Sequence, residues 1–387
     1  MAGDVAAIEA TLPEVSVQAT APAKDKRVAA HLRPIWKITV NGKDISDKLK
    51  PIFVRLTITD DRANDADEIE LVLSDHNHAV PLPDTGGIIT VAIGWRADPA
   101  SAPYRRLDSD EVGFPVGLID KGSFTIQAVE HSGAPDIITV RARAANMLDS
   151  LRTLRNQSWH ETTVGDILAS IAKRNSLPLS VDAEVGKRKV KHADQITESD
   201  ASFLRRLANT YDCLCTVKNG TLLFSQARAA RTPKGTDLDP VLITRAHGDQ
   251  HRWSRQDRDA YSGVRTWYSN IKTGQRSAVV AGISGRAKDL RTTYASREDA
   301  LAAARAEWLR IQRGIFAFDI TLAYGRADLF SQRPAEVSGF KDQIDETAWV
   351  ITSARHTLDA GGYTTQITLE TMQEDDVEGQ EETDDSD

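Results

Sequence analysis

The sequence predicts a mainly β protein of the α+β class, in which two related β domains flank a small α/β module. Three observations support this prediction. Many stretches alternate apolar and polar residues, a hairpin-like stretch near the C-terminus recurs in the first half of the chain, and the middle carries two amphipathic helical patterns. At 387 residues, the chain is long enough for two or three domains, each with its own core.

Composition and charge narrow the functional class. No apolar run approaches the roughly 18–20 residues of a membrane span, and the N-terminus lacks a signal-peptide pattern, so we expect no export by that route. The net charge of −8 belongs to residues 373–387, which contain nine carboxylates and no Lys or Arg, and the rest of the chain carries +1. A near-neutral body argues against a dedicated nucleic-acid binder. We expect the acidic tail to be disordered or to order only on a partner.

The hairpin-like stretch covers residues 344–370, where apolar residues alternate on both arms and Gly361-Gly362 provides a turn. Residues 119–131 align with residues 344–356 without a gap. The matched pairs are Ile119 with Ile344, Asp120 with Asp345, Phe124 with Trp349, Ile126 with Ile351 and His131 with His356, and upstream Gly94-Trp95 resembles Gly339-Phe340. We interpret this as a repeated β domain. Chance similarity between two amphipathic hairpins is the alternative, because strands use a small set of residue types.

The first β domain is predicted over residues 34–150. Residues 1–33 show no period and are read as an extended arm that either wraps a neighbouring subunit or is disordered. Asn41-Gly42 is a tight-turn signal, and residues 97–117 form an insertion that the second copy lacks. The expected strands are residues 36–40, 52–58, 69–73, 89–93, 119–126 and 137–140.

The middle of the chain, residues 151–228, is predicted to be the α/β module. Thr163 caps a helix with an apolar stripe over residues 164–172, and Ser199 opens a second helix that runs to Tyr211. Two short strands, 214–217 and 222–225, follow these helices.

The second β domain is predicted over residues 229–372. Its expected elements are strands 241–244 and 261–268, a loop over 271–290, a helix from Ser296 to Gly314, strand 316–322 and the hairpin 344–370.

A search for chemistry predicts no catalytic, cofactor-binding or metal site. Residues 60–67 are rich in Asp but lack the Gly and closing Glu of an EF-hand loop, so a solvated loop is favoured over a calcium site. Asp75, His76 and His78 could offer two imidazoles, but no further ligand has workable spacing, and a surface turn is favoured over a metal site. His160-Glu161 is followed by Val164 where a zinc-protease helix needs His.

The remaining candidates fail similar tests. His247 and His251 stand four apart in a stretch that is a poor helix, residues 282–285 lack the full spacing of a nucleophile elbow, and no phosphate-binding Gly-rich loop is present. Cys213 is expected to be a small buried hydrophobe, and its pairing with Cys215 is not expected because neighbours two apart cannot bridge within a strand. His131 and His356 match in the repeat, which favours a role in hairpin structure.

Six runs of the sequence, in order, resemble the bacteriophage late-control protein D family, the baseplate hub of contractile tails, and more distantly the hub part of type VI secretion spike proteins. They cover about residues 35–372. The runs are Asp67-Glu68-Ile69-Glu70-Leu71; Gly122-Ser123-Phe124-Thr125-Ile126 with residues 129–136; Ser158-Trp159-His160-Glu161-Thr162-Thr163; residues 198–208; Gly325-Arg326-Ala327-Asp328-Leu329; and Val337-Ser338-Gly339-Phe340-Lys341.

This resemblance implies a non-enzymatic homotrimer without cofactors, in which two β-barrel-like domains per chain give six similar units. Such a ring would adapt a sixfold tail tube to a threefold central spike and form part of the conduit for DNA. It also implies contacts with the tape-measure protein and baseplate wedge, no stable membrane association, and a place in the virion after assembly in the host cytoplasm. The inserted module is similar to LysM units, which bind peptidoglycan.

Two alternatives stay open from the sequence. The chain could be a tail-associated protein that binds or degrades the cell wall, with residues 158–226 as the module that contacts the glycan. It could also be the equivalent hub of a phage-derived bacteriocin or secretion device, because the mechanical task is the same.

Overall fold

The structure is a computed structural model that describes residues 32–62, 67–97, 115–144, 149–218, 220–227, 236–255, 261–269, 275–283, 285–372 and 379–382. Most of the expected arm, most of the expected insertion at 97–117, and most of the acidic tail lie outside these residues; the last two positions of the expected arm, Leu32 and Arg33, begin a strand. Strands dominate the described chain, as the sequence predicts.

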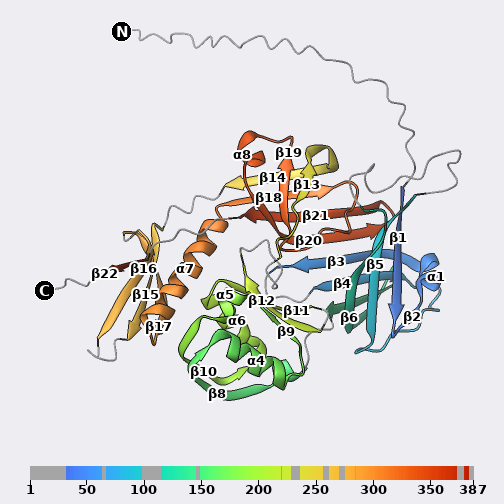
Figure 1. Cartoon of the computed structure of the whole chain (residues 1–387). Helices are drawn as coiled ribbons and strands as arrows, with labels where there is room; N and C mark the ends of the chain where they lie inside the picture. Colours follow the sequence, from blue (N-terminus) through green and yellow to red (C-terminus); the bar gives the residue numbers. More distant parts are fainter. Residues whose placement is uncertain are drawn as a thin grey trace, which may run out of the picture.

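One sheet of thirteen strands extends across the molecule and twists strongly along its length (Figure 1). Its order is β14-β18-β21-β20-β3-β4-β7-β6-β5-β1-β2, with β19 beside β20 and β13 beside β19. The first half of the chain contributes β1 (Leu32–Val40), β2 (Lys43–Asp44), β3 (Phe53–Asp61), β4 (Glu68–Ser74), β5 (Ile88–Ala97), β6 (Gly117–Ser132) and β7 (Ile137–Ala144), with α1 (Ser46–Leu49) between β2 and β3. The second half contributes β13 (Val241–Thr244), β14 (Gly248–Arg255), β18 (Phe316–Leu322), β19 (Pro334–Ser338), β20 (Trp349–Asp359) and β21 (Gly362–Thr371).

The two halves of this sheet have the same strand order. In the first half it is β3-β4-β7-β6-β5-β1, and in the second it is β14-β18-β21-β20-β19-β13, with the strands in the same sequence along the chain. The outermost pair differs, because β1 runs antiparallel to β5 whereas β13 runs parallel to β19.

The hairpins β6–β7 and β20–β21 also share their register. The ladder shifts by one residue after Ile126 in β6 and after Ile351 in β20. Immediately before the shift, the Ile126 N–H donates to the Gly87 carbonyl and the Ile351 N–H donates to the Arg333 carbonyl. Ile126 and Ile351 therefore hold the same place in their hairpins.

The start of the second hairpin differs from the prediction. Ile119 lies in β6, but Ile344, its match in the sequence, lies in the short helix α8 (Asp342–Asp345), and the strand begins only at Trp349. The Asp345 carboxylate accepts hydrogen bonds from the N–H groups of Gly339 and Phe340, and the Ile344 carbonyl accepts one from Trp349 Nε1. These bonds close the segment into a helical turn.

Each half has its own apolar core, but the second half contributes to both. Ala327, Leu358 and Tyr363 belong to the core of the first half, together with Leu56, Ile69, Phe124 and their neighbours. A separate cluster around Phe318, Trp349 and Ile367 fills the second half. The halves are thus packed together through side chains as well as joined through the sheet.

The middle module has the predicted helices. Its elements are α3 (Asp149–Arg152), β8 (Leu154–Thr163), α4 (Val164–Arg174), β9 (Leu179–Val181), α5 (Ala183–Gly186), β10 (Lys189–Ser199), α6 (Asp200–Thr210), β11 (Cys213–Lys218) and β12 (Thr221–Gln226). Thr163 and Ser199 cap α4 and α6, since their hydroxyls accept from the N–H groups of Asp166 and Ser202. Both helices bury the apolar stripes read from the sequence.

A second, four-stranded sheet has the order β17-β15-β16-β22 and corrects two predictions. The expected loop 271–290 contains two strands, β16 (Arg276–Gly282) and β17 (Ala287–Tyr294), which flank β15 (Gly263–Ser269). They form because Val279, Val280 and Ala281 are buried in this sheet, which packs against α7 (Arg297–Arg313). Part of the expected disordered tail, β22 (Gly379–Glu382), is a strand, because the open edge of β16 offers it backbone partners.

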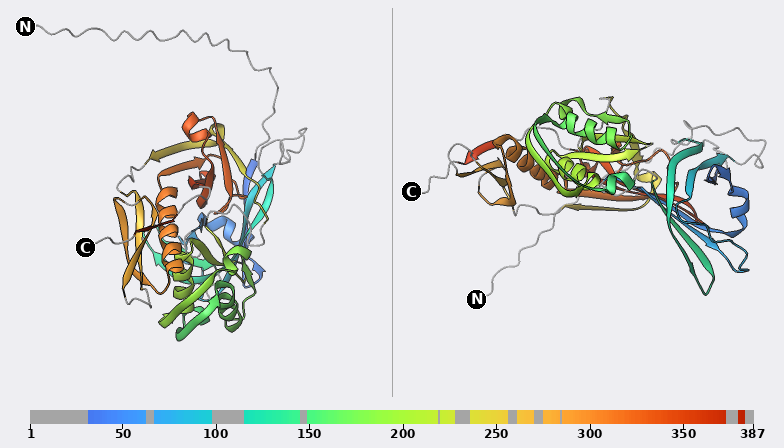
Figure 2. Two further views of the ribbon diagram at one scale, coloured as in Figure 1. Left: turned by 60° about the vertical axis from the view of Figure 1, so that its left-hand side comes forward. Right: turned by 90° about the horizontal axis from the view of Figure 1, so that it is seen from below.

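α7 lies beside the middle module (Figure 2). As predicted, Ser296 caps it, and it ends at Gly314. Its last turn carries Arg313, which donates two hydrogen bonds, of 2.6 and 2.5 Å, to the buried Asp212 carboxylate. This bidentate pair ties α7 to the module.

A fully buried carboxylate holds the middle module together and provides a test of the fold. Asp200 accepts hydrogen bonds from Arg174 Nε, Asn175 Nδ2 and Gln195 Nε2 at 2.8 Å each. We expect Asp200→Asn to lower the free energy of unfolding by about 3 kcal/mol, because Arg174 would lose its buried counter-ion. Urea denaturation measures the change. Asp47→Asn is the matched control, since its ion pair with Lys50 is exposed and contributes little; equal effects of the two substitutions would contradict the argument.

Candidate functional site

The candidate site is the junction between the two halves of the large sheet and the polar face that crosses it. At the junction β20 pairs antiparallel with β3, with Ser353 opposite Asp61 and Asp359 opposite Arg55. The ladder continues as the Arg62 N–H donates to the Thr352 carbonyl at 2.8 Å. The edge of the first half and the middle of the second therefore form one uninterrupted sheet.

Side chains lock this junction from the core side. Trp95 Nε1 donates to the Gly325 carbonyl at 2.6 Å, and its ring stacks on Tyr363 with centroids 5.4 Å apart. A Cβ at position 325 would lie 2.3 Å from the Tyr363 ring, so only glycine fits there. Ser331 Oγ also donates to Asp60 Oδ1 at 2.6 Å.

His356 lies at the centre of the junction and is fully buried. Its Nδ1 is 2.9 Å from Thr365 Oγ1 and 3.1 Å from the Tyr363 hydroxyl. Burial lowers the pKa of His356 well below its ordinary value, and the positive charge of Lys121 adds to this effect. The imidazole is therefore neutral at physiological pH and serves as a structural hydrogen-bonding group.

The opposite face of the same strands is polar and carries paired charges. Leu56, Ile58, Ile69 and Leu71 point to the core, so their neighbours on β3 and β4 point to the other face. The charged residues of this polar face on β3, β4, β6, β7, β14, β18, β20 and β21 are Arg55, Asp61, Glu68, Glu70, Asp120, Glu130, Arg141, Arg143, Arg252, Asp319, Arg355, Asp359 and Glu370. Both signs are interspersed across it, with carboxylates in modest excess.

Glu70 shows how these charges are paired. Arg55 Nη2 and Arg141 Nε, from the strands on either side, each donate to its carboxylate at 3.1 Å. Burial alone raises the pKa of Glu70, but the hydrogen bonds from Arg141 and Arg55 outweigh burial and hold that pKa below its usual value. A shallow groove lined by Glu70, Thr57, Arg355 and neighbouring polar residues crosses the β3–β20 junction on this face.

The sequence candidates for metal binding are only partly brought together. Asp75 and His78 meet His131 rather than His76, and one ligand atom from each lies within 4.8 Å of the others. Asp75 is already engaged, because its Oδ1 accepts from the Val80 N–H at 3.1 Å and its Oδ2 lies 3.4 Å from His131 Nε2. With two exposed imidazoles and this carboxylate in use, the cluster fastens the β6–β7 hairpin to the loop after β4.

The other sequence candidates are dispersed. His160 lies on β8 beside His192, with their Nδ1 atoms 3.0 Å apart. His247 ends a short 3₁₀ turn and His251 lies on β14, so they share no helix. Cys213 is buried, and burial raises its pKa to about 12, which makes it an inert thiol. Of the expected elbow 282–285, Ser284 lies outside the described residues.

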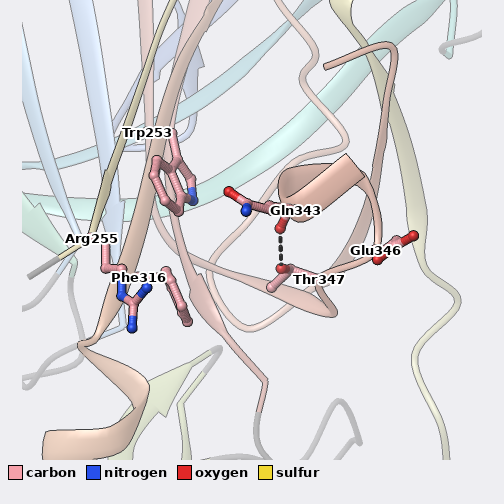
Figure 3. Close-up of a pocket in the computed structure, with 6 residues that line it drawn as sticks. All are labelled: Trp253, Arg255, Phe316, Gln343, Glu346 and Thr347. Carbon is pink, nitrogen blue, oxygen red and sulfur yellow. Dashed lines mark hydrogen bonds between the residues drawn. The ribbon is translucent and has the colours of Figure 1, made fainter. Parts of the chain in front are cut away.

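A further small pocket lies next to β14 (Figure 3). Trp253 stacks on Phe316 on one wall, and the other wall is α8 and its loop, where Thr347 Oγ1 donates to the Gln343 carbonyl at 2.7 Å. Among its lining residues, Glu346 is the one carboxylate, no histidine accompanies it, and the Thr347 hydroxyl is engaged with the Gln343 carbonyl. This composition offers no acid–base pair for catalysis.

The fold is shared with phage tail proteins of known structure. The 43 kDa tail protein of prophage MuSo2 from Shewanella oneidensis matches 87% of this chain and 98% of its own with a TM-score of 0.61 at 16% identity. The tail protein from Neisseria meningitidis MC58 matches 87% of this chain and 96% of its own with a TM-score of 0.63 at 14% identity. The Francisella PdpA–VgrG complex, lidded, has a chain that matches 91% of this chain and 55% of its own with a TM-score of 0.53 at 9% identity.

Sequence comparison is more specific. The family model of the phage tail baseplate hub (GPD) matches residues 116–362. The probable baseplate hub protein of Escherichia phage 186 is 36% identical over 92% of this chain and 97% of its own length. That of Escherichia phage P2 is 35% identical over 88% of this chain and 93% of its own length.

The chain thus has the fold of these tail proteins of known structure. The chain belongs to the phage tail baseplate hub family. It is a structural component of the virion and not an enzyme. Among the described residues, no helix has the length and apolar character needed to cross a membrane.

The buried His356 predicts a pH dependence of stability. The pKa of His356 is depressed in the folded state, whereas in an unfolded chain it is about 6.5. Just below pH 6.5, therefore, only the unfolded state takes up a proton at His356. The free energy of unfolding should then fall by about 1.4 kcal/mol per pH unit from this residue, and this loss is absent above pH 6.5. We expect His356→Gln to flatten the stability–pH curve between pH 6.5 and pH 5, measured by urea denaturation. The control His76→Gln, at an exposed loop position, should keep the wild-type slope; parallel curves for all three proteins would contradict a neutral buried His356.

Proposed function

We propose that three copies of this hub form a closed ring with six similar units, which adapts a sixfold tail tube to a threefold central spike. The observation that supports this most directly is the repeated strand order, β3-β4-β7-β6-β5-β1 and β14-β18-β21-β20-β19-β13, within one chain. A threefold ring presents six equivalent surfaces to a sixfold partner only if each chain contains the same unit twice. We infer that the two halves are duplicated, barrel-like hub domains.

The polar face of the large sheet suits the wall of a conduit for DNA. Carboxylates outnumber arginines on it, and Arg55, Arg141 and Arg143 lie within ion-pair distance of Glu70, Glu130 and Glu68. An excess of arginines would bind phosphates and release counter-ions, which would retain passing DNA. A hydrogen-bonding wall without excess positive charge allows transient contact without strong binding.

The middle module, residues 151–228, is proposed to be a LysM-like unit with a structural role. Binding of sugars usually needs exposed aromatic faces, and the aromatic residues of this module, Trp159, Phe203, Tyr211 and Phe224, are all buried. The module is instead fastened to α7 through Arg313 and Asp212. This burial disfavours the alternative of a protein that binds or degrades peptidoglycan, and the absence of retention on purified peptidoglycan is the expected outcome.

We further propose that the hub works in a contractile tail, is assembled in the host cytoplasm, and contacts the tape-measure protein and baseplate wedge besides the tube and spike. The hub of a phage-derived bacteriocin or secretion device would perform the same mechanical task and would need the same fold.

The ring predicts a definite oligomer. Native mass spectrometry of the full chain should give three times the chain mass, and cryo-electron microscopy of that species should show threefold symmetry with sixfold pseudo-symmetry around a central channel. A monomer at micromolar concentration, or a ring without the sixfold relation, would contradict the proposal.

The acidic tail should be dispensable for the ring. Removing residues 373–387 deletes β22, whose one strand partner among the described residues is β16, at the edge of the four-stranded sheet. Because the thirteen-stranded sheet is untouched, size-exclusion chromatography should show the same oligomer for truncated and full-length chains. Loss of the oligomer on truncation would assign the tail to the assembly interface.

A further inference from the structure

The large sheet has two open edges. The pairing of β20 with β3 within the chain predicts that each of these edges also binds a strand. Within the described residues, positions 128–132 of β6 pair with β7 on one side and with no strand on the other. Likewise, β14 pairs with β18 on one side only. Open edges of this kind present unpaired backbone groups and readily accept another strand.

The second half of the chain contains the pairing that the first half lacks. After its register shift, β20 continues into the ladder with β3, with Arg355 opposite Thr59 and His356 opposite Ile58. The corresponding stretch of β6, which follows the register shift after Ile126, forms the open edge. By the register of the two hairpins, Glu130 corresponds to Arg355 and His131 to His356.

β14 corresponds in the same way to β3. β3 has a register shift between Phe53 and Arg55 against β4, and β14 has one between Gly248 and Gln250 against β18. Counting from these shifts, Ile58, which faces Ile69, corresponds to Trp253, which faces Phe318. The open edge of β14 is therefore the counterpart of the β3 edge that binds β20.

We propose that β6 of one copy pairs antiparallel with β14 of the next copy, in the register of the β20–β3 junction. The inference rests on the proposed ring and names the surfaces that close it. The expected pairs across the interface are Val129 with Arg255, Glu130 with Ser254, His131 with Trp253 and Ser132 with Arg252. Each copy offers one such edge of each kind, so the contact is head-to-tail, and three copies close six junctions of one geometry.

The charges distinguish this junction from the one within the chain. Arg355 on β20 lies diagonally across from Asp61 on β3, whereas Glu130 on β6 would lie diagonally across from Arg252 on β14. Diagonal neighbours in a sheet are within reach of long side chains. The two pairs lie on opposite diagonals and have opposite arrangements of sign, so wrong pairing of β6 with β3 brings Glu130 towards Asp61, and wrong pairing of β20 with β14 brings Arg355 towards Arg252. This arrangement favours alternation of internal and intermolecular junctions.

A disulfide between copies tests the register. The Arg62–Thr352 hydrogen bond makes the Arg355–Thr59 pair a non-hydrogen-bonded pair, with the shorter Cβ separation that a cross-strand disulfide needs. Glu130→Cys with Ser254→Cys in the full chain should, on mild oxidation, convert most of the protein into covalent dimers and trimers on a non-reducing gel. The native Cys213 and Cys215 interfere little, because burial raises the pKa of both thiols to about 12.

The matched control is Glu130→Cys with Arg255→Cys. Ser254 is partly exposed and Arg255 is exposed, so both positions are accessible. Arg255 lies one step along the strand and points to the other face, so cross-linking should stay at the level of either single variant. Equal yields for the two pairs would overturn the proposed register.

A charge exchange gives a second readout that needs no cysteine. Glu130→Arg should weaken the trimer in analytical ultracentrifugation, and adding Arg252→Glu should restore it. Glu68→Arg is the control, because Glu68 also pairs with an arginine on the polar face but lies on β4, which has strands on both sides. No restoration in the double variant would contradict the pairing of these two strands.

The outcomes separate this inference from the proposed function. A wild-type chain that is monomeric at native mass overturns both the ring and the interface. A trimeric wild type in which Glu130→Cys with Ser254→Cys fails to link overturns the β6–β14 pairing alone and leaves the hub ring in place.

Discussion

The structure depends on the antiparallel pairing of β3 with β20, which joins the two halves of the chain into one sheet. Backbone hydrogen bonds fix the register of the junction. Leu358 and Tyr363 stabilise it further by packing into the apolar core of the first half. The glycine at position 325 is required because Tyr363 occupies the space that any side chain would need. A flexible link between two independent domains would not hold their strands in a common curvature. In the proposed ring, this junction would make one chain two consecutive segments of a larger wall.

The polar face of the large sheet pairs several of its charges between adjacent strands. A sheet buried on one face alternates apolar and polar positions on every strand, so the pleat alone makes the second face polar. Pairing of the charges on that face is a further step, as between Arg55 on β3, Glu70 on β4 and Arg141 on β7. Exposed pairs of this kind add little stability. In the proposed conduit their effect would be larger, because they would reduce the affinity of the face for a polyanion while keeping it hydrated.

The sequence predicts local elements well because these depend on near neighbours. Caps at Thr163, Ser199 and Ser296, the alternating strands of the first half, and the turn at Asn41-Gly42 all follow from residues within a few positions. The strands β16 and β17 were missed because they form only when β15 and α7 provide partners and cover. The Ile344 segment was misread as strand because Asp345 closes it into a turn through N–H groups that precede it. The meeting of Trp95 with Gly325, and of His78 with His131, has no local signal at all.

The position of the insertions in the sheet shows how one chain can serve partners of different symmetry. The β3–β4 connection is short, but its counterpart between β14 and β18 contains β15, β16, β17 and α7. The middle module is likewise inserted once, between the two halves, and Arg313 and Asp212 fasten it to α7. In the proposed ring, the sheet repeats six times, whereas α7 and the module repeat three times. The side of the ring that exposes only sheet would then match a sixfold tube, and the side that carries the insertions would match a threefold spike. Duplication with unequal insertion therefore gives the change of symmetry directly, without any conformational difference between copies.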